Sequence, residues 1–260
     1  MSSDDRYGEV TARFYDGAYA KLRSPSGDVA FYHALARETG GPVLELGCGT
    51  GRTLLPIANE GIACTGIDAS PAMLAAFAAK RPPANLDLVE ARMQDFDLGD
   101  RRFALVTAPF RVFQHLYEVG DQLACLANVK RHLVPGGAFA FDCFKPRLDR
   151  IAKREEPETE DGRFRDGDDG IVRTTEVTRE HAIQRQQVRM HYTRFRDGQV
   201  VSRERSDFSM RWFFRYELEH LLARAGFAEV SLFGDFDCSP YGEDSQELIF
   251  VARRPEEARA

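Results

Sequence analysis

Residues 43–51 read VLELGCGTG, in which four mostly apolar residues typical of a buried strand are followed by glycines at every second position. Glycine adopts positive φ at little cost and lets a ligand approach the backbone closely. In an α/β sheet the carboxyl end of the first strand is the usual place for a ligand, because the next helix offers free N–H groups there. A tight turn alone needs one or two glycines. The set Gly47, Gly49 and Gly51 therefore predicts a ligand-binding loop.

The chain from residue 42 to 143 alternates between short β-rich apolar runs and amphipathic segments, which is the pattern of βαβ units with a parallel sheet. Expected strands are 42–46, 62–68, 86–91, 103–109 and 138–144, followed by two more at 228–236 and 247–254. Two helices are expected to begin near Ser70 and near Asp121, and a third is expected to end near Gly226. Ser70 suits a helix cap with Pro71 at the first helical position. Residues 135–137, Pro-Gly-Gly, predict a turn before the fifth strand.

The character of the sequence changes after Phe144. Residues 145–170 are charged and rich in Gly and Asp, and three β-patterned stretches follow at 171–178, 182–195 and 199–214. The Asp-Gly pair at 197–198 is typical of a hairpin turn. We therefore expect an antiparallel β insertion over residues 145–211, between the fifth strand and the helix that follows it.

These patterns predict five segments along the chain. They are an N-terminal helical lid (1–40), a Rossmann-like cofactor-binding core (41–144), the antiparallel β insertion as a roof for the substrate (145–211), the remainder of the core (212–255) and a disordered tail (256–260).

Composition narrows the class of function. The chain has 260 residues, of which 43% are hydrophobic, enough for a substantial core. The net charge of -6 gives no basic footprint, so nucleic-acid binding is disfavoured and a small-molecule partner is expected. Oligomeric state stays open.

The cysteines and the absence of apolar segments bear on compartment. Five cysteines are scattered without a CxxC pair, and no His cluster has zinc spacing, so we expect a reduced, cytoplasmic protein without a metal site. The first residues lack the pattern of a signal peptide, and no apolar run approaches the ~20 residues that cross a bilayer. We expect neither export nor membrane insertion.

Two acids accompany the glycine loop. Asp68 ends the second strand, at the spacing at which an acid in a nucleoside-binding α/β fold accepts hydrogen bonds from both ribose hydroxyls. Glu45 lies two residues before the first glycine, where it favours an ammonium over a pyrophosphate. Arg52 occupies the place of the third glycine of a GxGxxG dinucleotide motif. An amino-acid-like nucleoside is favoured, and a nicotinamide dehydrogenase is weakened.

The runs LELGCGTG, GIDAS, ARMQDFDL, FALVTAPFRVFQHL and RHLVPGGAFAFDCF together resemble the class I S-adenosylmethionine-dependent methyltransferases. The resemblance covers residues 42–144 and about 212–253. It implies an α/β, Rossmann-like, seven-stranded and mostly parallel sheet with strand order 3-2-1-4-5-7-6 and a reversed last strand. The cofactor would be S-adenosylmethionine.

The resemblance also assigns roles in binding this cofactor. Glu45 and the glycine loop would hold the methionine moiety, and Asp68 would hold the ribose. The other residues expected to contact the cofactor, mainly around the adenine, are Cys48, Ala69, Met73, Met93, Gln94 and Ala108. Many relatives have an Asp where this chain has Arg92. Arg cannot accept a hydrogen bond from adenine. The adenine contact then falls to Gln94, Asp95 or the backbone, and Arg92 is equally well explained as a solvated surface charge.

The methyl acceptor is the least determined part. The run APFRVFQHL lacks the Asn/Asp-Pro-Pro-aromatic sequence of DNA and protein-amide methyltransferases, so those acceptors are disfavoured. Candidate catalytic residues are His115, as a base or orienting group, and Tyr15; candidate substrate residues are Arg111, for an anionic group, and Tyr19. A core or capping histidine and a structural salt bridge are the alternatives for His115 and Arg111, and ordinary helix packing is the alternative for both tyrosines.

The β insertion and the segment FYDGAY resemble small-molecule methyltransferases of the glycine and amino-sugar N-methyltransferase type. In that comparison the tyrosines are lid residues. The insertion also carries basic residues at strand spacing, which could face the substrate, although a solvent-exposed sheet face is favoured. They are Arg189, His191, Arg194 and Arg196. We therefore expect methyl transfer to a nitrogen, in preference to an oxygen, of a small molecule. The alternative is a non-catalytic sensor or partner subunit that binds the cofactor.

Overall fold

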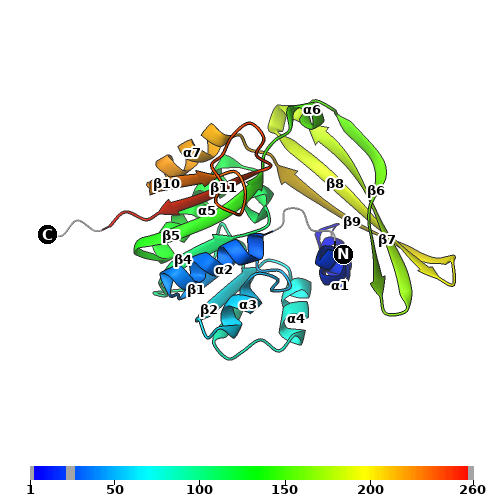
Figure 1. Ribbon diagram of the computed structural model, residues 1–260, viewed down its shortest axis with the longest axis horizontal. Coiled ribbons are helices and arrows are strands. Elements are labelled where there is room, and N and C mark those ends of the chain that lie inside the picture. The colour runs from blue at the N-terminus through cyan, green and yellow to red at the C-terminus, as the bar shows by residue number, and fades with distance from the viewer. Residues whose placement is uncertain (1–2, 22–26, 257–260) are drawn as a thin grey trace. The chain divides into compact units, whose positions relative to one another are not determined.

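The structure is a computed structural model that describes residues 3–21 and 27–256 of the chain (Figure 1). These residues form two compact units. The first unit contains residues 3–21 and 146–211, and the second contains residues 27–145 and 212–256. The helical lid expected over residues 1–40 is divided between the two units, with one helix in each among the described residues. All of the expected tail except Glu256 lies outside the described residues.

The second unit is an α/β sandwich. Its helices in chain order are α2 (Asp28–Thr39), α3 (Leu54–Asn59), α4 (Pro71–Ala79), the short 3-10 helix η1 (Val112–His115), α5 (Val119–His132) and α7 (Arg215–Arg224). Its strands are β1 (Val43–Leu46), β2 (Cys64–Asp68), β3 (Leu86–Glu90), β4 (Phe103–Ala108), β5 (Leu133–Phe144), β10 (Ala228–Phe233) and β11 (Glu247–Arg253).

These strands form one seven-stranded sheet in the order β10-β11-β5-β4-β1-β2-β3 (Figure 1). Only β11 runs antiparallel to its neighbours β5 and β10. Counting the strands of this unit in chain order, the arrangement is 3-2-1-4-5-7-6 with a reversed last strand. The predicted fold is therefore confirmed.

Local signals in the sequence account for these elements. All four residues of β1 are buried, as expected for a central parallel strand that is covered on both faces. The side chain of Ser70 accepts a hydrogen bond from the Met73 amide and Pro71 is the first residue of α4, as predicted. The Pro-Gly-Gly run does not form a separate turn. It lies inside β5, where the pairing with β4 shifts between Leu133 and Ala138.

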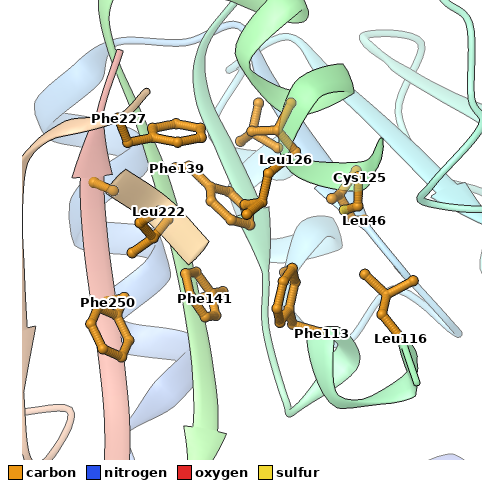
Figure 2. Close-up of a cluster of buried hydrophobic side chains, with 14 of the residues drawn as sticks. Leu46, Phe113, Leu116, Cys125, Leu126, Phe139, Phe141, Leu222, Phe227 and Phe250 are labelled. Atoms are coloured by element: carbon orange, nitrogen blue, oxygen red, sulfur yellow. The ribbon is translucent and has the colours of Figure 1, made fainter. Parts of the chain in front are cut away.

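Each face of the sheet has its own hydrophobic core. On one face α5 and α7 cover an aromatic stack in which the Phe141 ring lies 4.9 Å from that of Phe139 and 5.4 Å from that of Phe250 (Figure 2). On the other face α2, α3 and α4 contribute Phe31, Tyr32, Ile57 and Phe77, among others, to the second core. The first core packs α5 and α7 against the sheet, whereas the second includes residues next to the predicted ligand-binding loop.

The first unit is a four-stranded antiparallel sheet in the order β6-β7-β8-β9, with α1 packed against β6 and β9. Its elements are α1 (Ser3–Lys21), α6 (Leu148–Ile151), β6 (Glu155–Asp166), β7 (Asp169–Glu180), the 3-10 turn η2 (His181–Ile183), β8 (Arg185–Arg196) and β9 (Gln199–Arg211). The fold prediction of an antiparallel β insertion after the fifth strand is confirmed.

The sequence did not predict β6. This strand reads EEPETEDGRFRD, and Phe164 is its one buried residue, so it lacks the alternation of apolar and polar residues that marks a half-buried strand. Its side chains are held instead by polar cross-strand contacts. Asp161, for example, accepts hydrogen bonds from Arg173 Nε at 2.8 Å and from Thr175 Oγ1 at 2.8 Å.

Candidate functional site

Four acids lie on one face of the core sheet, toward α2. Glu45 of β1 is in register with Thr107 of β4 and, on its other side, with Gly66 of β2. Thr107 is in turn in register with Ala140 of β5. Side chains two residues apart in a strand share a face, so Asp68 and Asp142 lie on the same face as Glu45.

Glu247 of β11 pairs with Phe144, two residues beyond Asp142, and therefore joins the same face. We call Asp68, Glu45, Asp142 and Glu247 the acidic row. It crosses the sheet at the carboxyl ends of β2, β1 and β5 and at the start of β11, which is the edge where ligands bind in open α/β sheets.

The glycine loop lies beside this row, and a side chain is absent from its three glycine positions for different reasons. All three have positive φ, from 52° to 84°. A Cβ on Gly51 would lie 2.3 Å from the Phe77 ring, and one on Gly47 would lie 2.7 Å from Val112 Cγ1, so the protein's own packing excludes side chains there. A Cβ on Gly49 would meet no atom within 4 Å. Of the triplet, Gly49 is thus the residue whose backbone faces open space.

Asp68 fastens this loop to the second strand. Its Oδ2 accepts a hydrogen bond from the Gly49 amide at 2.8 Å, and its Oδ1 accepts one from the Ser70 amide at 2.8 Å. Burial raises the pKa of the carboxyl group, and the two amides partly oppose this rise. Each oxygen keeps a lone pair for a further donor.

Glu45 is deeply buried beside the glycine loop, with 1% of its surface exposed. Burial raises its pKa to about 8, against the opposing effects of the Arg52 guanidinium and of Thr107, whose hydroxyl donates to Oε2 at 3.5 Å. A buried carboxyl with so raised a pKa is suited to a cationic partner, because a nearby positive charge favours ionisation.

Arg52 connects the glycine loop to two other elements. Its Nη2 forms an ion pair with Asp28 Oδ2 at 2.6 Å, at the start of α2. Its Cζ lies 4.6 Å from the centroid of the Phe110 ring, in the loop after β4. The residue that departs from the dinucleotide motif is therefore a structural link between three segments.

Asp142 holds the loop after β4. Its Oδ1 accepts hydrogen bonds from the Tyr32 hydroxyl at 2.6 Å and from the Phe110 amide at 2.7 Å, and its Oδ2 accepts from the Arg111 amide at 3.0 Å. Phe110 and Arg111 have φ values of 60° and 68°, a conformation that costs a non-glycine residue roughly 1–2 kcal/mol. The hydrogen bonds from these two amides to one buried carboxylate offset this cost.

The side chain of Arg111 is paired with the last acid of the row. Arg111 Nη2 lies 2.8 Å from Glu247 Oε1, and its Cζ lies 5.6 Å from the Phe144 ring centroid. The sequence favoured Arg111 as a site for an anionic group of the substrate. A buried carboxylate now balances the guanidinium and Asp142 adds a second acid nearby, so the role of Arg111 toward the substrate stays a prediction. The alternative, a structural salt bridge, is what the structure contains.

The other residues assigned to the cofactor lie around the same edge with different exposures. The side chains of Cys48 and Ala108 are buried in the two cores, so only their backbone could contact a ligand. Ala69 is exposed, and Met73 is buried behind the N-terminus of α4. Met93 and Gln94 are partly buried in the turn after β3, and Asn128 donates to the Gln94 carbonyl at 2.9 Å.

Arg92 and His115 differ in their surroundings. Arg92 forms an exposed ion pair with Asp95, 3.0 Å between Nη2 and Oδ2, in agreement with the interpretation of Arg92 as a surface charge. His115 is the last residue of η1 and is partly buried.

The remaining candidates belong to the first unit. Tyr15 and Tyr19 lie on α1 with ring centroids 4.6 Å apart, and the Arg173 guanidinium lies 5.2 Å from the Tyr19 ring. The basic residues of the insertion are engaged within their own sheet. Arg194 and Arg196 pair with Asp169, and Arg189 and His191 lie 3.5 Å and 3.4 Å from Glu176 Oε1.

Four residues of the second unit were missed by the sequence interpretation: Asp28, Tyr32, Asp142 and Glu247. Asp142 and Glu247 had a usable signal, because an ionisable residue within an otherwise apolar buried strand must have a partner or a function. For Asp28 and Tyr32, the local sequence contains no signal of a role in the site.

Two structural searches concern metals and membranes. In residues 3–21 and 27–256, no group of three or more His, Cys, Asp or Glu side chains is placed to hold a metal ion. Over the same residues, the helices are all too short or too polar to cross a bilayer.

Comparison with known proteins finds similarity to methyltransferases in part of the core. A family model described as a methyltransferase domain matches residues 43–137. A cypemycin N-terminal methyltransferase of a Streptomyces species is 33% identical over 56% of this chain and 59% of its own length. A dTDP-3-amino-3,6-dideoxy-α-D-glucopyranose N,N-dimethyltransferase of Streptomyces fradiae is 31% identical over 53% of this chain and 54% of its own length. The chain thus matches little more than half the length of these relatives.

Solved structures agree over nearly the whole chain. The CcbJ methyltransferase of Streptomyces caelestis superposes with a TM-score of 0.76, 25% identity and coverage of 96% of this chain and 98% of that one. CalS10 of Micromonospora echinaspora, an amino pentose methyltransferase solved with S-adenosylmethionine bound, superposes with a TM-score of 0.70, 23% identity and coverage of 90% and 94%.

Proposed function

We propose, from the match of residues 43–137 to a methyltransferase domain, that the protein transfers the methyl group of S-adenosylmethionine to an amine nitrogen of a small molecule. One observation carries the proposal. Within the matched segment, the open backbone of Gly49 lies next to Asp68 and on the same sheet edge as the buried acid Glu45.

The charges at this edge fit the cofactor. S-adenosylmethionine carries an ammonium, a sulfonium and a carboxylate, so it is a net cation at neutral pH. The acidic row and Asp28 together outnumber the two guanidiniums of Arg52 and Arg111. A cationic ligand would lower the raised pKa of Glu45, because a nearby positive charge stabilises the ionised carboxylate that burial destabilises.

Each part of the site would have a separate task. Asp68 would accept from the ribose hydroxyls with the lone pairs that the Gly49 and Ser70 amides leave. Gly49 would let the methionine moiety approach the backbone, and Met73 and Met93 would border the adenine. When bound, the cofactor supplies an electrophilic methyl group, so the protein's part is mainly to align the acceptor nitrogen and to exclude water.

The nature of the acceptor is supported by charge and by the relatives. The relatives named above are a cypemycin N-terminal methyltransferase and an N,N-dimethyltransferase of a dTDP-linked amino sugar. An amine reaches the site as a cation, and a site with excess carboxylate favours cations over anions. Tyr15 and Tyr19 remain proposed lid residues, and His115 a proposed orienting residue for the acceptor.

The experiment combines the protein with S-adenosylmethionine that carries a deuterated methyl group and with separate acceptors. These are an amino-sugar nucleotide, the matched sugar nucleotide with a hydroxyl in place of the amine, a short peptide with a free N-terminus, and glycine. We expect a labelled product from at least one amine and none from the hydroxyl control, as measured by mass spectrometry. Binding of S-adenosylhomocysteine without a labelled product from any of these would reject the enzyme and support a sensor.

A further inference from the structure

Only one of the two carboxylate oxygens of Glu247 has a partner among the described residues. The residue is 2% exposed and its Oε1 is 2.8 Å from Arg111 Nη2. Its Oε2 is also buried, but it has no hydrogen-bond partner among the described residues. A buried carboxylate oxygen without a donor costs free energy, so an orphan of this kind indicates a donor that arrives from outside the chain.

The surroundings of Glu247 define what that donor can be. Burial raises the pKa of Glu247, Asp142 and Asp235 raise it further, and Arg111 opposes this rise. Three carboxyl groups, those of Glu247, Asp142 and Asp235, thus lie near one guanidinium. An anionic ligand would be repelled here, and a neutral or positively charged N–H donor would be favoured.

The location places this oxygen on the same sheet edge as the proposed cofactor site. Glu247 belongs to the acidic row that also includes Glu45 and Asp68, and Arg111 lies in the loop after β4. The Arg111 side chain is 28% exposed, so the pair reaches the surface through the guanidinium. The Nε of Arg111 has no partner among the described residues either.

Asp142 provides the contrast within the same row. Both of its oxygens receive donors from the chain itself, namely Tyr32, Phe110 and Arg111. Asp142 therefore has a structural task that is complete without a ligand. Glu247 is the acid of the β5–β11 side whose hydrogen bonding is incomplete.

We propose that Glu247 is an acceptor-binding residue, whose Oε2 accepts a hydrogen bond from the amine that becomes methylated. The proposal rests on the function proposed above and adds the residue that recognises the acceptor. It also gives Arg111 a role, because the ion pair with Oε1 fixes the carboxylate so that Oε2 is the oxygen presented to the amine.

Glu247 can also take the proton that blocks the nitrogen. An alkylammonium has no free lone pair, so one N–H bond must break before the nitrogen attacks. The carboxylate of Glu247 receives that proton and becomes a neutral carboxylic acid, and the ammonium becomes a neutral amine. The nitrogen lone pair then forms the bond to the methyl carbon while the carbon–sulfur bond breaks toward sulfur. Its pKa, raised to about 7, suits this exchange near neutral pH.

The test compares wild type with Glu247→Gln, which keeps the shape and the contact to Arg111 but removes the charge. The probe is whichever amine of the panel above the wild type methylates. We expect the KM for the amine to rise about 10- to 100-fold, because a hydrogen bond to a charged group is lost, while S-adenosylhomocysteine binds as tightly as before. We also expect the rise of kcat/KM with pH around pH 7 to be reduced in the variant.

Two further variants separate this role from a structural one. Glu247→Asp keeps the charge but withdraws it by one methylene, so its KM should lie between those of wild type and the Gln variant. Glu219, which pairs with Arg215 on the exposed face of α7, provides the matched control Glu219→Gln, and this variant should behave as wild type.

An unchanged KM and pH profile in Glu247→Gln, with active wild type, would overturn this proposal and leave the proposed function intact. If Glu247→Gln does not bind S-adenosylhomocysteine, the Asp variant decides, and wild-type kinetics in that variant would also overturn the proposal. If the wild type methylates no amine, both proposals fall together.

Discussion

The guanidinium of Arg52 lies over the ring of Phe110, with 4.6 Å between Cζ and the ring centroid. Arg52 follows the glycine loop after β1, and Phe110 lies in the loop after β4, so this contact joins the two loops that border the acidic row. The ion pair between Arg52 and Asp28 extends the link to α2. These loops are therefore expected to respond together when one of them is changed.

Replacing Phe110 with Leu tests that coupling. The change removes the ring but keeps an apolar side chain, and a cation–π contact of this kind contributes about 0.5–2 kcal/mol. We expect S-adenosylhomocysteine to bind about 2- to 20-fold more weakly by calorimetry, because Arg52 is less well fixed beside Glu45. Tyr216→Leu removes a ring that lies 5.2 Å from Arg215 in the same unit and should leave the affinity unchanged. Equal affinities for all three proteins would show that the loops are independent.

The glycines of the loop should separate stability from binding. Gly51→Ala places a methyl group against the Phe77 ring in a left-handed conformation, so we expect a loss of about 2–4 kcal/mol in the free energy of unfolding. Gly49→Ala meets no neighbouring atom, so its cost is the backbone conformation alone, about 1–2 kcal/mol. S-adenosylhomocysteine affinity should nevertheless fall more in Gly49→Ala. Urea unfolding and calorimetry measure the two quantities, and the opposite ranking in affinity would contradict a ligand contact at Gly49.

Much of the core was predictable because its signals are local. A buried apolar strand, a glycine loop and a Ser-Pro helix start each lie within a few residues, and the resemblance to a known family supplied the strand order. β6 was missed because a charged strand held by cross-strand ion pairs has no apolar period. The pairings of the acidic row were not predictable for a different reason. Tyr32 and Asp142 are 110 residues apart in sequence, and Arg111 and Glu247 are 136 apart, so only the folded sheet brings them together.

Cofactor specificity can be checked against the rival nucleotide. Glu45 and Arg52 replace the features that a GxGxxG loop uses for pyrophosphate, and the raised pKa values of the acidic row favour a cation. Calorimetric titration should therefore show S-adenosylhomocysteine binding and no binding of NAD. Asp68→Ala should weaken S-adenosylhomocysteine at least 10-fold, since hydrogen bonds to a charged group are lost. NAD binding of comparable strength would reject the methyltransferase interpretation.

The bond between Tyr32 and Asp142 should stabilise the unit through the loop after β4. Tyr32→Phe removes one of three donors to a buried carboxylate, so we expect a loss of about 1–3 kcal/mol in the free energy of unfolding. Asp142→Asn should cost more, because the amide nitrogen cannot accept from the Phe110 or Arg111 backbone. Urea unfolding measures both. Tyr216→Phe, on an exposed ring, is the control, and a Tyr32→Phe variant as stable as this control would contradict the role of Asp142.

The pH dependence of stability follows from the burial of Glu45. Its pKa is raised from 4.5 to about 8 in the folded protein, so the unfolded chain loses this proton first as the pH rises. The stabilising effect of the protonated form is complete below about pH 4.5 and disappears as the pH approaches 8, because stability falls with pH wherever the folded state binds more protons.

We therefore expect the free energy of unfolding of wild type, minus that of Glu45→Gln, to decrease steadily between pH 5 and pH 8 in urea titrations. Glutamine carries no titrating proton, so the subtraction removes the contributions of other groups. Saturating S-adenosylhomocysteine should flatten the difference, since its ammonium would favour the ionised carboxylate. A difference that is constant or rises over this range would show that Glu45 is ionised in the folded protein, and the charge argument for a cationic ligand would lose its main support.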